Sequence, residues 1–273
     1  MFIRGGKPVG LPRKPDSNMT TKYILFSGLL ALCGLTACQH NHTTNSADTD
    51  NKQARWLAGD HHVHSIYSAK WDHSTYPATP ILAGDAINST LLNLQMAHKH
   101  GLSWLVTTDH GGPGHSQLNF QQAYPALVAA RQAVPEVMAF YGMEFDTPGA
   151  RHSTLIIPHF SGEAQQLLAI ESSYNRREIY PDESPRDSDP FMAEALAFMA
   201  RQQPAPLLLV NHPARTASGL GEYGKVTPAR IRQWHDSAAN VVIGMTALPG
   251  HQAATLHPDG SQNPDKPRAE YFQ

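Results

Sequence analysis

The chain has 273 residues, a formal net charge of −2 and 41% hydrophobic residues. This length suits one sizeable α/β domain, and the charge lacks the basic excess that is typical of nucleic-acid-binding proteins. Both cysteines lie within the first 38 residues, which excludes a disulfide framework in the rest of the chain. Beyond them, no segment has the roughly 20 consecutive apolar residues that a membrane span needs.

Residues 19–38 have the pattern of a bacterial lipoprotein signal. Lys22 provides a positive start, and residues 23–35 form an apolar stretch of signal-peptide length. The sequence Leu35-Thr36-Ala37-Cys38 resembles a lipobox, in which the cysteine is diacylated and becomes the new N-terminus. An ordinary secretory signal or a buried helix is the alternative interpretation. Two acyl chains would anchor the protein stably to a lipid bilayer.

The segments on either side of this signal define the predicted parts of the chain. The residues before Met19 resemble no part of a signal, so we interpret Met19 as the true start. Gln39 after the acylated Cys38 favours sorting to the outer membrane. We therefore expect a lipid-anchored domain in the cell envelope that faces the periplasm. The predicted parts are an upstream misreading (1–18), a signal peptide (19–37), a polar flexible tether (38–54) and a catalytic domain (55–273).

From residue 55 onward, short apolar runs alternate with helical periodicity, which is typical of βα units. The apolar runs predict strands over 56–59, 102–106, 137–141, 154–157, 207–210 and 241–243. Helical spacing and capping residues predict helices over 85–100, 117–133, 190–201 and 228–237. Pro125 should kink or split the second helix. The charged, proline-broken residues 171–189 are predicted to form an excursion or lid outside the core.

Candidate metal ligands occur at the ends of most of these strands. Strand alternation puts His62 and His64 on one face, where both imidazoles can reach the same cation. The other candidates are Asp109, His110, Glu144 and His212 after strands, and His152 just before one. In a parallel α/β barrel, the carboxyl ends of the strands form the face that carries the active site. Imidazole and carboxylate ligands together suit Zn, Mn or Fe.

These residues fall into a set of motifs that resembles the PHP (polymerase and histidinol phosphatase) family. The motifs are His62-x-His64-Ser65, Thr108-Asp109-His110, Gly142-x-Glu144, His152 and Asn211-His212-Pro213, in the order of that family, and the resemblance covers about residues 56–252. It implies a distorted (β/α)7 TIM-like barrel with two or three divalent ions that hydrolyses phosphoesters. A Gly250-His251-Gln252 segment is similar to one in uncharacterised PHP proteins.

The resemblance also implies a role for each ligand. His62, His64 and Glu144 would hold the first ion. Glu144 would bridge to a second ion held by His152 and His212. His110 would serve a third ion, with Asp109 either as a ligand or as its supporting partner. Water bound to such ions ionises near neutral pH and can attack a phosphate ester.

Two departures from the family pattern predict an incomplete site. Ala69 and Lys70 stand where the family places a further His or Asp, and Asp72 or His73 could substitute only in a rearranged loop. The closing Asp-x-His motif of the family is absent. About six strands are predicted, which is too few to close the barrel comfortably. We therefore expect a barrel that is truncated at the C-terminus and poorly active. The alternatives are a tail that docks in a new way and a second chain that supplies the missing ligands.

Three arginines are candidates for binding an anionic substrate. Arg215 follows His212 closely and could grip a phosphate bidentately as a catalytic residue, with a solvated loop position as the alternative. Arg176 and Arg177 could also meet an anion, although a solvated surface suits their polar segment better. The predicted function is hydrolysis of a small phosphorylated substrate by metal-activated water. An amidohydrolase-type metalloenzyme and a non-catalytic metal-binding lipoprotein remain as alternatives.

Overall fold

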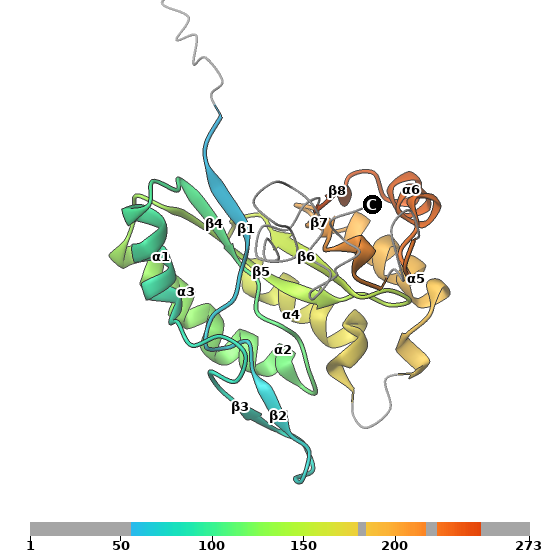
Figure 1. Ribbon diagram of the computed structural model, residues 1–273, viewed down its shortest axis with the longest axis horizontal. Helices are drawn as coiled ribbons and strands as arrows, with labels where there is room; N and C mark the ends of the chain where they lie inside the picture. The colour runs from blue at the N-terminus through green and yellow to red at the C-terminus, as the bar shows by residue number, and fades with distance from the viewer. Residues whose placement is uncertain (1–55, 180–183, 217–222, 247–273) are drawn as a thin grey trace, which may run out of the picture. The chain divides into compact units, whose positions relative to one another are not determined.

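The computed structural model describes residues 56–179, 184–216 and 223–246. The predictions for the signal, Cys38, the tether and the tail after residue 246 therefore lie outside the described residues. Within those residues, six strands form one sheet in the order β1-β4-β5-β6-β7-β8. The strands are β1 (Gly59–Val63), β4 (Trp104–Thr107), β5 (Met138–Asp146), β6 (His152–Ile157), β7 (Leu207–Val210) and β8 (Val242–Met245). The sheet curls as an incomplete barrel would (Figure 1).

The direction of β6 corrects the expectation of a parallel sheet. β1, β4 and β5 pair in parallel, and so do β7 and β8, but β6 pairs antiparallel with both β5 and β7. The start of β6 therefore lies at the same edge as the ends of its neighbours. This reversal explains why His152 precedes its strand whereas the other candidate ligands come late in theirs or after them.

A second sheet was not predicted. Its strands, β2 (Lys70–Asp72) and β3 (Thr79–Ile81), pair antiparallel within the long connection between β1 and the first helix. Strands of three residues are too short to show a period of two in the sequence. β1 also differs from the prediction, because it begins at Gly59 and runs through His61 and His62 to Val63, ending just before His64.

The described residues contain the four predicted helices and a further helix over 163–174 that was not predicted. The helices are α1 (Thr90–Lys99), α2 (His115–Leu118), the π-helix η1 (Asn119–Ala123), α3 (Tyr124–Ala133), α4 (Glu163–Tyr174), α5 (Asp189–Ala200) and α6 (Pro228–Ser237), with short 3-10 turns η2 (Arg176–Glu178), η3 (Ser184–Arg186) and η4 (Pro213–Thr216). Helices α1, α3 and α4 pack along the sheet (Figure 1). Among the described residues, none of these helices has the length and apolarity needed to cross a bilayer.

Local chemistry explains where several helices begin and end. Thr227 caps α6 by accepting a hydrogen bond from the backbone N–H of Arg230 at 3.2 Å, and Pro228 occupies the first turn. Gly101 ends α1 with a left-handed φ of 77°. Pro125 has no N–H to donate one turn back, and the predicted interruption occurs there as η1, a π-helical turn.

The core lies between the sheet and its helices. Its largest fully buried side chains include Tyr141, Phe145, Leu155, Leu167 and Ile170. The predicted excursion is shorter than expected, because α4 continues to Tyr174 and the polar side chains of Glu171 and Asn175 are fully buried. Polar composition alone therefore misassigned the beginning of that segment.

Candidate metal centre

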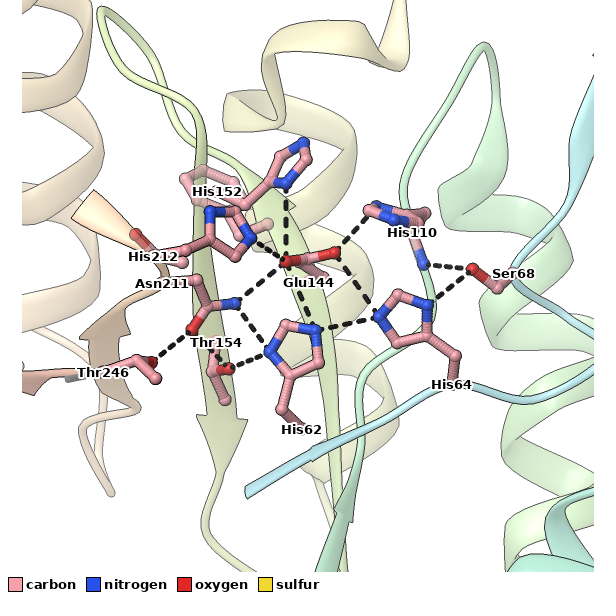
Figure 2. A network of polar contacts seen from close by, with 12 residues as sticks. His62, His64, Ser68, His110, Glu144, His152, Thr154, Asn211, His212 and Thr246 are labelled. Atoms are coloured by element: carbon pink, nitrogen blue, oxygen red, sulfur yellow. Dashed lines mark hydrogen bonds and ion pairs between the residues drawn. The ribbon is translucent and has the colours of Figure 1, made fainter. Parts of the chain in front are cut away.

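Glu144 lies at the centre of a cluster of five imidazoles (Figure 2). Its carboxylate is 1% exposed, and β5 holds it at the edge where the ligand-bearing strand ends meet. The distances from its oxygens to ring nitrogens are 3.3 Å for His62, 3.4 Å for His64, 2.9 Å for His110, 3.4 Å for His152 and 3.2 Å for His212. The structure thus brings together six of the seven candidate metal ligands, all except Asp109.

Backbone pairing brings these residues to one point. The register of β1 on β4 shifts between Asp60 and Val63, and such irregularities re-aim the side chains around them. The backbone N–H of Glu144 donates to the carbonyl of Asp109 at 3.0 Å, which extends the β4–β5 pairing to His110. On the other side, β6 begins at His152 and β7 ends just before Asn211 and His212.

The spacing of these donor atoms fits a divalent cation. A tetrahedral ion with bonds of 2.0–2.1 Å separates its ligand atoms by about 3.3 Å. The nitrogen–oxygen distances from His62, His64 and His152 to Glu144 are 3.3, 3.4 and 3.4 Å. Nδ1 of His110 and Nδ1 of His152 are buried and find no well-aligned hydrogen bond within the described part of the chain. Buried donor atoms in this condition need another partner, and a cation between them and Glu144 would supply it.

The charges of the centre agree with this fit. Burial opposes ionisation of Glu144, but the imidazoles of His110, His152 and His212 beside it outweigh burial and hold the pKa of the carboxyl far below its usual range. Burial likewise opposes protonation of His64 and His152, yet their carboxylate partners raise the pKa of each imidazole to about 9. The site therefore concentrates negative charge that protons or metal ions must balance.

Three groups of described residues have donor atoms within 4.8 Å of one another: His62–His64–Glu144, His110–Glu144–His152 and His64–Asp85–His110, and His212 belongs to none of them. Asp85 was not predicted, because it lies in a loop outside every motif. Its Oδ2 accepts a hydrogen bond from Ser68 at 2.9 Å and lies 2.8 Å from Nδ1 of His64.

Asp85 and Glu144 approach the same two imidazoles from opposite ring nitrogens. His64 directs Nε2 to Glu144 and Nδ1 to Asp85, and His110 directs Nδ1 to Glu144 at 2.9 Å with Nε2 4.0 Å from Asp85. A neutral imidazole has a single free lone pair. These two histidines therefore suit two ions that share Glu144, with Asp85 accepting the remaining N–H of His64 as an orienting carboxylate.

Asn211 and His212 complete the centre from the end of β7. The Asn211 amide donates to Glu144 at 3.1 Å and accepts from the hydroxyls of Thr154 at 3.0 Å and Thr246 at 3.3 Å. This role was missed, although Asn211 stands in a predicted motif. His212 has a φ of 29°, a region that residues other than glycine rarely adopt and that is commoner at functional sites.

Asp109, predicted as a catalytic residue, lies behind the imidazole cluster. It is 3% exposed, and its two oxygens accept hydrogen bonds from the backbone N–H of Ser65 at 2.5 Å and the Ser65 hydroxyl at 2.8 Å. Burial raises the pKa of this carboxyl despite those hydrogen bonds. The position corresponds to the supporting role that was the alternative for Asp109, because it fixes the loop that follows His64.

A cavity of about 640 Å³ opens beside the centre, and its lining includes Asp85, His110, Asp146, His152 and Arg215. Nη1 of Arg215 lies 3.3 Å from Nε2 of His212, so the predicted anion-binding arginine does reach the centre. His73, one of the two proposed substitute ligands, also lines this cavity. The other, Asp72, hydrogen bonds to Ser74 on the surface at 2.6 Å and belongs to none of the three groups.

Comparisons with known proteins do not identify the chain. No family model and no curated protein matches it. Among solved structures it is similar to a protein from Bifidobacterium adolescentis that is described as a candidate metal-dependent phosphoesterase, with 11% sequence identity and a TM-score of 0.37 over 77% of this chain and 80% of that one. At this score the likeness carries no argument, and function has to be inferred from the site.

Proposed function

We propose that this protein is a metal-dependent hydrolase that cleaves a phosphate monoester or diester. The proposal rests on one observation: the buried carboxylate of Glu144 belongs to two of the ligand groups, beside a cationic cavity. Two divalent ions held by a bridging carboxylate are a common arrangement in enzymes that displace groups at phosphorus. The motif order supports membership of the PHP family, with the curled sheet as part of its seven-stranded barrel.

Each part of the site has a role in this proposal. Divalent ions bound here would ionise water near neutral pH and neutralise charge on the phosphate oxygens. His62 and His64 would hold one ion with Glu144, while His110 and His152 would hold the other. His212 has Nε2 3.2 Å from Glu144 but belongs to neither group. Arg215 would orient the phosphate through its planar guanidinium. Ser65 and Asp109 would keep the loop after His64 fixed.

The predicted anchor gives the proposal a location. A diacylated Cys38 would hold the domain on the periplasmic side of the outer membrane, where its substrate would have to be available. Fractionation of cells that express the wild type or Cys38→Ala tests this point. Equal membrane association of both would contradict the anchor.

The reaction class is tested with the full chain purified and loaded with Zn²⁺, Mn²⁺ or Fe²⁺. Initial rates are measured on p-nitrophenyl phosphate, bis-p-nitrophenyl phosphate and p-nitroacetanilide, and metal content is measured on the same samples. We expect turnover of at least one phosphate ester, none of the anilide, and loss of turnover on chelation. Turnover of the anilide alone would replace the proposal with an amidohydrolase, and bound metal without turnover of any substrate would contradict catalysis.

A further inference from the structure

The cavity beside the metal centre has more positive charge than one ester phosphate requires. Its described lining includes five cationic side chains and two carboxylates, Asp85 and Asp146. The cationic residues are Lys70, Arg151, Arg176, Arg177 and Arg215. Arg215 contacts the imidazole cluster directly, with Nη1 3.3 Å from Nε2 of His212. The five cations outnumber the two carboxylates, and a concave wall with an excess of positive charge focuses its field into the cavity and attracts an anion there.

Two of these arginines stand on a short turn that is fixed at both ends. In η2, the buried side chain of Asn175 accepts a hydrogen bond from the backbone N–H of Arg177 at 3.3 Å. Arg186 donates to the Asn175 carbonyl at 2.9 Å, and the Glu178 carbonyl accepts from the N–H of Gly114 at 2.9 Å. A turn that is held in this way presents its arginines at lower entropic cost than a free loop would.

A third arginine is tied to the same wall. Arg151 ends the tight turn between β5 and β6, where its carbonyl accepts from the N–H of Thr147 at 2.9 Å. Asp187 holds this turn through the N–H of Gly149 at 2.8 Å, and it also lies 3.8 Å from Nε of Arg176. Asp187 therefore links the two segments that present these arginines.

Arg177 is coupled to the metal centre through Asp146. This carboxylate is fully buried, and its Oδ1 lies 3.7 Å from Nη1 of Arg177 and 3.5 Å from Nε2 of His152. Neither oxygen of Asp146 has a hydrogen-bond partner within the described residues. At 3.7 Å, the ion pair between Arg177 and Asp146 is longer than a hydrogen bond, so the guanidinium fork of Arg177 can still bind another anion.

We propose that Arg151, Arg176 and Arg177 form a second anion site, and that the substrate therefore has a further phosphate or carboxylate a few bonds from its ester phosphate. This inference rests on the proposed function, because the metal centre and Arg215 define where the first phosphate lies. The volume of about 640 Å³ is within the range of pockets that enclose a whole small molecule. The substrate class is thus bifunctional anions rather than simple monoesters.

Three phosphonates of matched length test the second site without requiring turnover. Propylphosphonate has one anionic group, trimethylene bisphosphonate has a second phosphonate, and phosphonobutyrate has a carboxylate in its place. Affinities for the metal-loaded full chain are measured by calorimetry. We expect at least one of the two bifunctional compounds to bind about tenfold or more tightly than propylphosphonate, as one additional charge-assisted contact would give. The bifunctional compound that shows the higher affinity indicates whether the site takes phosphate or carboxylate.

Variants decide whether the arginines cause the gain. Arg177→Gln should remove most of it, and Arg177→Lys should restore only part, because lysine keeps the charge without the bidentate fork. Arg232→Gln, which changes an exposed arginine on α6, is the matched control and should keep the full gain. Circular dichroism and thermal unfolding establish that each variant is folded.

The outcomes separate this inference from the proposed function. Equal affinities of the three compounds in the wild type, or a gain that survives in the triple variant Arg151→Gln/Arg176→Gln/Arg177→Gln, would overturn the second site. An arginine-dependent gain without turnover of any phosphate ester would support the second site and contradict the proposed reaction. Ester turnover without a gain in affinity would support the proposed reaction and contradict the second site.

Discussion

Replacing Glu144 with glutamine is the most informative single change in this protein. The substitution keeps the volume of the side chain and removes its charge. Glu144 belongs to two of the three ligand groups, and its oxygens lie between 2.9 and 3.4 Å from five imidazoles. The remaining group, His64–Asp85–His110, does not contain it. We therefore expect the variant to lose both ions at Glu144 and to retain at most one ion per chain.

The size of the effect follows from the ligand count. Mutation of a residue that only orients a metal ligand typically costs 10- to 100-fold in affinity. Glu144 is a shared anionic ligand in this site, so the loss in affinity for each ion should exceed about 100-fold. Phosphatase activity at a fixed, limiting metal concentration should fall at least as far.

Metal content after desalting, read by mass spectrometry, and zinc titration by calorimetry measure the effect directly. His98→Ala is the control, because His98 is exposed on α1 and should not alter either value. If the Glu144→Gln protein is folded and retains the wild-type metal content, the assignment of this centre is wrong.

Three further predictions follow from named contacts. Asp85→Asn should lower zinc affinity about 10- to 100-fold and leave the number of ions at saturation unchanged; the loss of one ion would show instead that Asp85 ligates a third. Ion pairing with Glu171 outweighs burial and raises the pKa of His115 to about 9. Protonated His115 therefore stabilises the fold fully below pH 6.5, and this stabilisation is lost as pH rises toward 9. The free energy of unfolding, measured with urea on zinc-loaded protein, should fall over this range by on the order of 3 kcal/mol. A His115→Gln variant with an unchanged slope over that range would refute this. Ser65→Ala should destabilise the fold by about 1–3 kcal/mol because it leaves a buried Asp109 oxygen without its donor, whereas the exposed Ser74→Ala should cost under about 0.5 kcal/mol by the same assay.

The sequence predicted those features of the fold that depend on local chemistry. The capping pair Thr227-Pro228 and the left-handed Gly101 mark helix ends by rules that act within a few residues. Five of the six apolar runs likewise overlap strands of the main sheet, whereas the run over 56–59 meets β1 only at Gly59. The direction of β6 could not be predicted in this way, because alternation along a strand is the same in both directions.

A site residue could be predicted from the sequence where it lies at or near the end of a strand, and not elsewhere. His62, His110 and Glu144 come at points where an apolar run gives way to polar residues, which is a signal in the sequence itself. Asp85 comes from a loop 21 residues after His64, and only the tertiary structure brings its carboxylate to that ring. Asn175 illustrates the same limit, since a buried asparagine in a charged segment cannot be distinguished by composition from a solvated one.

The reversal of β6 concentrates the chemistry of this site in one hairpin. Because β6 turns back directly after β5, Glu144 pairs with Thr154 and Asp146 pairs with His152 across the antiparallel ladder. Two adjacent strands thus provide Glu144, the carboxylate of Asp146 that faces Arg177 and the imidazole of His152, and the turn between the strands presents Arg151. A slip of one residue in this register would turn one set of side chains to the opposite face of the sheet. The metal centre and the proposed second anion site therefore depend on the same register, so a change that shifts the hairpin should weaken metal binding and anion binding together.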